Sequence, residues 1–391
     1  MPSINSKLTI IKLQRESLLK ALRFVQKIVP NNPQLPILSS VLLKLEKGKL
    51  LLSSTDLYFG IQSRVITSAK EELNAAIPGH VFKDIVNSLK SETLDIVIEE
   101  GKMKINSNGS TALIPIQDPK DYPDFPKIDS KKMVLDLDTM SKIDKFVCFA
   151  AGIDQARPIL TTLLIKLTNK GLKAVATDGF RLAILDLPNV VSESKSEEEI
   201  LVPSRYFSEV YKIALQSEVE KITIFAEEEL KQLRFEVGES DVYVRLVEGE
   251  YPPYEKIVPE SFLMSISFDG EGFQEELKRA AILAKEASNI VVVKNESLSD
   301  KNSEIKQDYS NIEIESNSMS KGSYVGKLPL LANASDFFQI AFNVNYILDF
   351  LNSCKPGIVE MRLNDSLKPA MFLINGNDSF KYIVMPFRVN Q

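Results

Sequence analysis

The sequence is poor in the residues that most often carry chemistry, with two cysteines and one histidine among 391 residues. Cys148 and Cys354 lie in apolar segments of helical pattern and have no paired spacing, which favours buried free thiols over a disulfide or a metal site. His80 stands at the start of a predicted helix, so we interpret it as a surface residue and not as a catalytic base. Glycine-rich phosphate loops and the H-E-x-x-H motif are absent from the sequence. We therefore predict no enzyme, no catalytic residue and no cofactor.

Two acidic groups could suggest metal ligands, namely Asp136 with Asp138, and the run Glu227, Glu228, Glu229. An exposed strand face and a hairpin tip explain these groups better, because charge runs usually lie in solvent. We predict no metal site.

Long apolar runs and an excess of positive charge are also missing. No stretch of about 18 uncharged apolar residues occurs, and the N-terminus has no basic region followed by an apolar core. These two absences predict a cytoplasmic protein with no membrane partner. The net charge is -6, from 47 Lys+Arg and 53 Asp+Glu, which argues against nucleic-acid binding unless the cations are clustered.

The sequence does contain an internal repeat in an ordinary globular composition, 44% apolar and 26% charged. Thr55-Asp56 and Thr177-Asp178 are 122 residues apart, and each pair lies between two apolar runs. Similar closing phrases, DYPDFPKI at 121–128 and GEYPPYEKI at 249–257, are 129 residues apart. Three segments carry an apolar stripe at i, i+3, i+4 and i+7, at 77–90, 202–217 and 342–355. These features share a period of about 130 residues, a third of the chain.

Each repeat also begins with a second helical pattern, at Glu16–Val29, Asp138–Ala151 and Glu271–Ala287. Strand-like runs with turn signals lie consecutively between the helices, which favours antiparallel α+β domains over a parallel sheet. We predict three α+β domains of like fold, each with two helices packed on antiparallel sheets, at residues 1–130, 131–260 and 261–391. The polar runs 294–323 and 192–199 are predicted to be exposed loops, the first an enlarged hairpin loop.

The six predicted helices together carry a charge of +4, so the rest of the chain carries -6 - 4 = -10. Helix surfaces that merely hold cations are one interpretation of this difference. The other is that six equivalent helices face a polyanion, as in a ring around DNA. The candidate DNA-facing residues are Lys20, Arg23, Lys27, Lys83, Lys142, Lys145, Arg205 and Lys212.

Several segments resemble the bacterial sliding clamp family, the beta subunit of DNA polymerase III. They include LPILSSVLL (35–43), AVATDGFRLAI (174–184), FNVNYILDFLN (342–352) and the terminal YIVMPFRV (382–389), in the order the family has them. The resemblance implies three DNA-clamp domains, a head-to-tail homodimer ring of six domains, and a non-catalytic accessory subunit of the polymerase. The implied partners are double-stranded DNA, the clamp loader, the catalytic subunit of the replicative polymerase, and other clamp-binding replication and repair proteins. The alternative is a clamp-fold interaction scaffold that does not encircle DNA.

The resemblance also implies a cleft between the second and third domains that takes a short partner peptide with Leu and Phe anchors. Two other interpretations stay open: a plain strand-end turn for Thr177-Asp178, and ordinary core burial for the terminal strand. Carried over to this sequence, the cleft comprises Leu160, Thr177, Gly179, Phe180, Arg181, Leu182, Pro252, Lys256, Ile257, Asn343, Tyr346, Leu367, Val384, Met385, Pro386 and Phe387.

Overall fold

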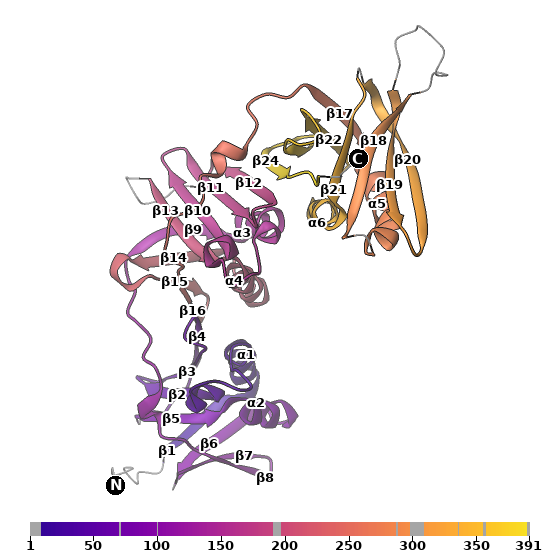
Figure 1. Cartoon of the computed structure of the whole chain (residues 1–391). Coiled ribbons are helices and arrows are strands. Elements are labelled where there is room, and N and C mark those ends of the chain that lie inside the picture. The colour runs from indigo at the N-terminus through magenta and orange to yellow at the C-terminus, as the bar shows by residue number, and fades with distance from the viewer. Residues whose placement is uncertain are drawn as a thin grey trace. The chain divides into compact units, whose positions relative to one another are not determined.

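The computed structural model describes residues 9–69, 72–99, 101–190, 197–286, 288–297, 309–334, 336–354 and 357–388 (Figure 1). Along these residues the same order of elements occurs three times: one strand, a helix, four strands, a helix and three strands. The predicted internal repeat is therefore present as a repeated fold unit.

The first repeat contains β1 (Thr9–Gln14), α1 (Arg15–Val25), β2 (Ser40–Glu46), β3 (Lys49–Thr55), β4 (Phe59–Ile66), β5 (Leu73–Pro78), α2 (Gly79–Ser88), β6 (Thr93–Glu99), β7 (Lys102–Ser107) and β8 (Ser110–Pro115). The second contains β9 (Lys131–Asp136), α3 (Leu137–Phe146), β10 (Thr162–Thr168), β11 (Gly171–Thr177), β12 (Arg181–Leu187), β13 (Glu198–Pro203), α4 (Ser204–Ser217), β14 (Lys221–Glu227), β15 (Gln232–Val237) and β16 (Ser240–Arg245). The third contains β17 (Met264–Asp269), α5 (Gly270–Ala284), β18 (Ile290–Ser297), β19 (Tyr309–Ser318), β20 (Gly322–Ala334), β21 (Gln339–Asn343), α6 (Val344–Cys354), β22 (Ile358–Leu363), β23 (Ala370–Ile374) and β24 (Asn377–Val384).

Within each repeat the strands form two antiparallel groups of four. In the first repeat the groups run β1-β6-β7-β8 and β5-β2-β3-β4, and the other two repeats follow the same order. The turn between β2 and β3 is Lys47-Gly48, as the sequence predicts, and both residues have positive φ (50° and 75°). The predicted α+β class with antiparallel sheets is confirmed.

Neighbouring repeats are joined by strand pairing. β4 of the first repeat pairs with β16 of the second, with Ile61 opposite Val242. β12 of the second repeat pairs with β24 of the third, with Leu182 opposite Ile383. The first junction merges two four-stranded groups into an eight-stranded sheet, and the second, with a single bridge between β17 and β20, merges three groups into a twelve-stranded sheet.

Because of these junctions, the chain divides into two compact units that cut across the second repeat. One unit combines the chain up to Leu137 with Glu209–Leu246, and the other combines Asp138–Ser208 with the chain from Val247 onward. Each junction, β4 with β16 and β12 with β24, lies within one unit.

The helices bury the predicted apolar stripes, but α1, α3 and α5 end earlier than predicted. Leu18, Leu22 and Val25 of α1 are almost fully buried, yet this helix ends at Val25 and not at residue 29. Helix α5 ends at Ala284 because Ser288 and Asn289 follow with positive φ (58° and 60°), a conformation that does not continue a right-handed helix. Helix α3 ends at Phe146, and a short 3₁₀ turn at Cys148–Ala150 takes the place of its predicted last turn.

The prediction of a loop over 294–323 is wrong for most of the described part of that run. β18 and β19 pair as an antiparallel hairpin and β19 pairs with β20, while 298–308 lies outside the described residues. In β19 the buried side chains alternate, with Ile312, Ile314 and Ser316 facing the core, and the Ser316 hydroxyl donates to the carbonyl of Ala280. Of the second predicted loop, 198–199 begins β13 and 191–196 lies outside the described residues.

No helix in the described residues is long and apolar enough to cross a membrane.

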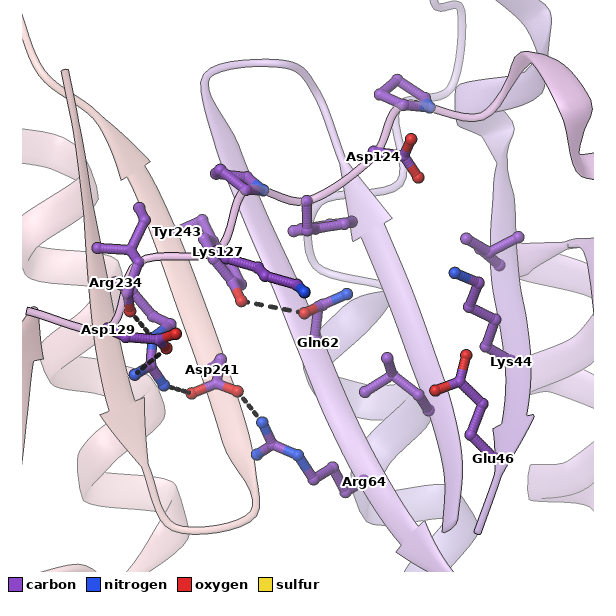
Figure 2. A pocket seen from close by; sticks show the side chains of 16 residues that line it. Lys44, Glu46, Gln62, Arg64, Asp124, Lys127, Asp129, Arg234, Asp241 and Tyr243 are labelled. Carbon is purple, nitrogen blue, oxygen red and sulfur yellow. Dashed lines mark hydrogen bonds and ion pairs between the residues drawn. The ribbon is translucent and has the colours of Figure 1, made fainter. Parts of the chain in front are cut away.

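The junction between β4 and β16 contains a buried carboxylate that two arginines share (Figure 2). Asp241 on β16 has a side chain only 2% exposed, and its two oxygens pair with Arg64 of β4 and, at 2.8 Å, with Arg234 of β15. Arg234 also donates from Nε to the carbonyl of Ile128 at 2.7 Å. The cluster lines a polar hollow of about 280 Å³ and ties the chain between the first two repeats to their shared sheet.

We predict that Asp241→Ala lowers the free energy of unfolding by about 3 kcal/mol, because it leaves two arginines without their shared buried carboxylate. Urea denaturation of the full-length protein measures this loss. Asp186→Ala is the control, since Asp186 pairs with Lys173 across an exposed strand pair at 3.2 Å and its loss costs less than about 1 kcal/mol. Equal losses in the two variants would contradict the proposed role of Asp241.

Candidate partner-peptide cleft and DNA-facing helices

The turn between β11 and β12 is shaped by the side chains of Thr177 and Asp178. The Thr177 hydroxyl donates to the carbonyl of Arg181 (2.6 Å) and accepts from the amide of Gly179 (3.0 Å). Asp178 Oδ1 accepts from the amides of Phe180 (2.9 Å) and Arg181 (3.0 Å). The interpretation of Asp178 as a strand-end turn residue is confirmed, and the same turn leaves Phe180 54% exposed.

The turn at Thr55-Asp56 in the first repeat has the same hydrogen bonds. Thr55 donates to the carbonyl of Phe59 and accepts from the amide of Leu57, while Asp56 Oδ1 accepts from the amides of Tyr58 and Phe59. Leu57 has φ 79°, close to the φ of 93° at Gly179. The repeated Thr-Asp pair therefore specifies one turn geometry at both places.

Arg181 is fixed from several sides. Its guanidinium pairs with Asp178 (2.9 Å) and with Asp349 of α6 (2.6 Å), and its Cζ lies 4.8 Å from the ring centre of Tyr346. The ring of Tyr346 stacks on that of Phe180 at 6.5 Å. Burial, and then the neighbouring Asp178, raise the pKa of Tyr346, while Arg181 opposes this shift. Two repeats thus meet at one ordered group of aromatic and charged side chains.

The segment after β24 continues along this group. The amide of Met385 donates to the carbonyl of Phe180 at 2.8 Å, and Met385 remains 38% exposed. Thr177, Leu182 and Val384 are at most 4% exposed, so they lie under the surface as its support. The terminal strand is therefore buried in the core, while Phe180 and Met385 beside it stay accessible at the surface.

The remaining predicted cleft residues lie on nearby elements of the same unit. Leu160 lies beside Gly179, since a Cβ at Gly179 would lie 3.9 Å from Leu160 Cδ1. Pro252, Lys256 and Ile257 lie in or next to a 3₁₀ turn at Tyr254–Ile257, whose Tyr254 packs in one buried cluster with Leu182. Asn343 Oδ1 accepts from the amide of Asn345 at the start of α6.

Leu367 and Phe387, by contrast, line a separate hollow of about 630 Å³ in the third repeat, together with Leu263, Met264 and Phe337. These last three residues belong to different strand ends and share no motif, so no sequence pattern marks them. Asp349 was likewise not predicted as the partner of Arg181, although the three-residue spacing from Tyr346 places both on one face of α6.

The eight candidate DNA-facing cations lie on α1 to α4, except Lys27, which lies in the turn after α1. Lys142 pairs with Asp138 (2.6 Å) and Lys212 with Glu209 (2.7 Å), so each shares its charge with an acid of its own helix. Lys27 donates to Gln216 Oε1 at 3.1 Å, and partial burial lowers its pKa, a shift that Glu209 opposes. Lys20, Arg23, Lys145 and Arg205 are exposed, and Lys83 is half-buried.

The residues considered as a catalytic base or as metal ligands lie apart from one another. His80 is half-buried and not a surface residue as predicted, and its Nδ1 lies 2.7 Å from Gln26 Nε2. Asp136 ends β9, and Asp138 pairs with Lys142. Glu227 ends β14, and Glu228 and Glu229 begin the 3₁₀ turn between β14 and β15. Within the part of the chain that the structure describes, no three His, Cys, Asp or Glu residues group as metal ligands.

Family models for the three domains of the DNA polymerase III beta subunit match this chain in order. The N-terminal domain matches 9–126, the central domain 134–253 and the C-terminal domain 255–388. Among curated relatives, the beta sliding clamp of Pseudomonas aeruginosa is 28% identical over 385 residues, covering 96% of this chain and 99% of that protein. The beta sliding clamp of Synechocystis is 25% identical over 397 residues, covering 96% and 98%.

Solved structures agree with these matches. A DNA polymerase sliding clamp from Pseudomonas aeruginosa superimposes with a TM-score of 0.88 at 26% identity, over 97% of this chain and 100% of that one. A sliding clamp from Bacillus subtilis, 21% identical, shares the fold with a TM-score of 0.89 over 98% of this chain and 100% of that one.

The repeated fold and these similarities first define a class, the sliding clamps built from three α+β clamp domains. Within it, this chain belongs to the DNA polymerase III beta subunit family. The predicted sliding-clamp function in DNA replication is thereby confirmed, and so is the predicted role as the non-catalytic subunit of that polymerase. The alternative of a scaffold that does not encircle DNA is not favoured.

Both cysteines are free, as predicted, and both are half-buried. Burial raises the pKa of Cys148 to about 12, against hydrogen bonds with Ser204 and Ser208 that lower it. Burial likewise raises the pKa of Cys354 to about 12. A free thiol has a pKa near 8.5, so both groups stay protonated at pH 8 in the folded protein.

We predict that iodoacetamide alkylates both cysteines of the folded protein at pH 8 at least about 100-fold more slowly than a free cysteine, because the thiolate is the nucleophile. Mass spectrometry over a time course measures the rates. In urea both should react like free cysteine. Reaction of either residue in the folded protein at the free rate would contradict its raised pKa.

Proposed function

We propose that two copies of this clamp close into a ring around duplex DNA and tether the catalytic subunit of the replicative polymerase. A ring holds DNA by topology, so it slides on phosphate contacts that break and re-form without reading bases. A tethered polymerase rebinds at a high effective concentration, which makes synthesis processive without any reaction in the clamp.

The observation that supports a ring is that the edge strand of one repeat pairs with the edge strand of the next at both junctions. β16 and β24 close the junctions to β4 and β12, and β8 and β20 are their equivalents in the first and third repeats. β8 pairs with β7 alone in the described residues, and β20 meets a second strand, β17, at a single bridge. Leu113 of β8 and Val325 of β20 are 62% and 53% exposed. Pairing β8 of one copy with β20 of another would repeat the same junction and cover these two exposed strands.

Three domains per copy, ending near residues 130 and 260, follow from this arrangement. The repeated order of elements and the three family matches at 9–126, 134–253 and 255–388 support these boundaries. Two copies then supply twelve helices, two from each repeat.

We propose that these helices form the surface that faces DNA. Lys20 and Arg23 on α1, Lys145 on α3 and Arg205 on α4 are exposed cations there, while Lys142 and Lys212 share their charge with acids. Partly neutralised cations suit a sliding contact, because weak phosphate contacts exchange quickly.

Partners dock, we propose, on the rim formed by Phe180, Met385, Leu160 and Ile257. Phe180 and Met385 are half-exposed while their backbones are hydrogen-bonded to each other, so the apolar surface is held in place before a partner arrives. Two apolar anchors at about 1.5–3 kcal/mol each, less the cost of association, suit micromolar binding and exchange between partners. The same site would serve the clamp loader and other replication and repair proteins in the cytoplasm.

We predict that the clamp, loaded on nicked circular DNA by a clamp loader, stays on circles and leaves when a restriction enzyme linearises them. Gel filtration of labelled protein with DNA measures retention. Lys20→Glu with Arg23→Glu should lower loading without abolishing run-off from cut ends, since topology and not charge retains the ring. Equal loss from circular and linear DNA would refute the ring.

We predict that Phe180→Ser and Met385→Ser each weaken a partner peptide with Leu and Phe anchors by about tenfold, because each removes about 1.4 kcal/mol of apolar contact. Fluorescence polarisation of a labelled peptide measures the affinity. Met319→Ser, at a fully exposed residue between β19 and β20, is the control. Unchanged affinity in both cleft variants would refute the proposed rim.

A further inference from the structure

The junction between the first and second repeats has the same backbone arrangement as the junction that forms the proposed rim. At the end of β16, the amide of Arg245 donates to the carbonyl of Tyr58 at 2.8 Å. At the other junction, the amide of Met385 donates to the carbonyl of Phe180 at the same distance. Tyr58 therefore takes the place of Phe180, and Arg245 takes the place of Met385. Tyr58 is 59% exposed, against 54% for Phe180.

Leu57 adds a second exposed apolar side chain, at an unfavourable backbone position. Its φ is 79°, in the left-handed region that a residue with a Cβ rarely adopts and that glycine adopts freely. The equivalent residue in the second repeat is Gly179. Leu57 stays 44% exposed, so burial of its side chain does not offset the strain. Strained residues concentrate at functional sites, which points to a use for this side chain outside the core.

A hollow of about 140 Å³ lies beside these two side chains. Leu57 and Tyr58 line it together with the segment 123–126 and Tyr243. The ring of Phe125 is held in this wall, because it packs edge-on against Tyr243 with 5.0 Å between the ring centres. The segment 123–126 and Tyr243 also border the polar hollow shown in Figure 2. A cavity of about 150 Å³ holds a benzene ring, so this hollow has room for one apolar side chain of a partner.

The edge of this hollow carries a cation without a carboxylate partner. Arg245 is exposed, forms no ion pair within the described part of the chain, and has its Cζ 6.0 Å from the ring centre of Tyr58. Lys231, directly before the strand residue that pairs with Arg245, is a second exposed cation. Of the nearby acids, Asp56 accepts two backbone amides of its own turn, and Asp124 lies on the 123–126 wall. A carboxylate of a partner therefore fits at the Arg245 edge and not at the opposite wall.

We propose that this first-junction site, formed by Leu57, Tyr58 and Arg245, binds a segment of a partner protein that has an apolar side chain next to an aspartate or glutamate. The apolar side chain enters the hollow, and the carboxylate pairs with Arg245. Binding here does not require the rim, which has the uncharged Met385 where this site has its cation. One clamp can therefore hold two partner segments of different chemistry.

The test uses the full-length protein with Phe180→Ser and Met385→Ser combined, which removes the rim. The probes are two labelled peptides with blocked ends, GSELFESG and GSQLFQSG, so that a carboxylate or its neutral amide flanks the apolar pair on either side. Fluorescence polarisation at low salt, with protein up to the millimolar range, measures both affinities, because salt screens an exposed charge pair.

Three further substitutions are made in this rim-free protein, namely Leu57→Gly, Tyr58→Ser and Arg245→Gln. Leu57→Gly removes the side chain and also relieves the positive φ, so weaker binding in this variant does not arise from misfolding. Lys170→Gln, at an exposed cation in the turn between β10 and β11, is the matched control for loss of charge.

We expect the Glu peptide to bind the rim-free protein about fivefold more tightly than the Gln peptide. Leu57→Gly and Tyr58→Ser should each weaken the Glu peptide about fivefold, because each removes apolar contact. Arg245→Gln should abolish the difference between the peptides, and Lys170→Gln should preserve it.

Three results would overturn the first-junction site: no binding of the Glu peptide to the rim-free protein, equal affinity of that protein for both peptides, or unchanged binding in Leu57→Gly. None of these touches the rim, whose own binding is read from the difference between the unmodified and the rim-free protein. Equal affinity of those two proteins for the Glu peptide, with the expected loss in Leu57→Gly, would support this site and refute the rim.

Discussion

Strand pairing between successive repeats is the constraint on which the rest of this structure depends. A four-stranded group leaves an edge of unpaired amides and carbonyls, and here the edges of β4 and β12 are covered by β16 and β24. The pairing of Arg181 with Val384 brings the turn of one repeat beside the last segment of the next. The rim of Phe180 and Met385 is therefore a consequence of how two sheets join.

The two Thr-Asp turns show how one backbone geometry serves different ends. Both turns have the same four local hydrogen bonds, so the fold requirement is equal. In the first repeat Phe59 is 4% exposed and belongs to the core. In the second, the equivalent Arg181 is held by Asp178 and Asp349 beside the exposed Phe180. The repeated Thr-Asp pair specifies the turn geometry. The side chains that follow it determine which groups pack into the core, as Phe59 does, and which stay exposed, as Phe180 does.

Much of the local structure could be predicted from the sequence, and the misses have physical causes. Apolar stripes at helical spacing predict the six α-helices that the described residues contain, because side-chain periodicity is a local property. Helices α1, α3 and α5 end earlier than their apolar patterns predict, and after α5 the residue Asn289 has a backbone conformation that does not continue a helix. The polar run containing β19 predicts a loop but forms a strand, because its buried Ser316 donates its hydroxyl to the carbonyl of Ala280 of α5, a contact that no local pattern records.

For the site, the resemblance of short segments identified Phe180, Arg181, Tyr346 and Met385, which the structure brings together. It also groups Leu367 and Phe387 with them; these two line a hollow with Leu263 and Phe337, and their part in the cleft stays a prediction. The sequence by itself determined the threefold repeat, the α+β class, the family and the turn residues, since all of these follow from local patterns. Only the tertiary structure decided which strand edges meet, which carboxylates hold Arg181 and where the exposed apolar side chains gather. Those contacts join residues far apart in the chain, and no periodicity or motif records which of them lie side by side.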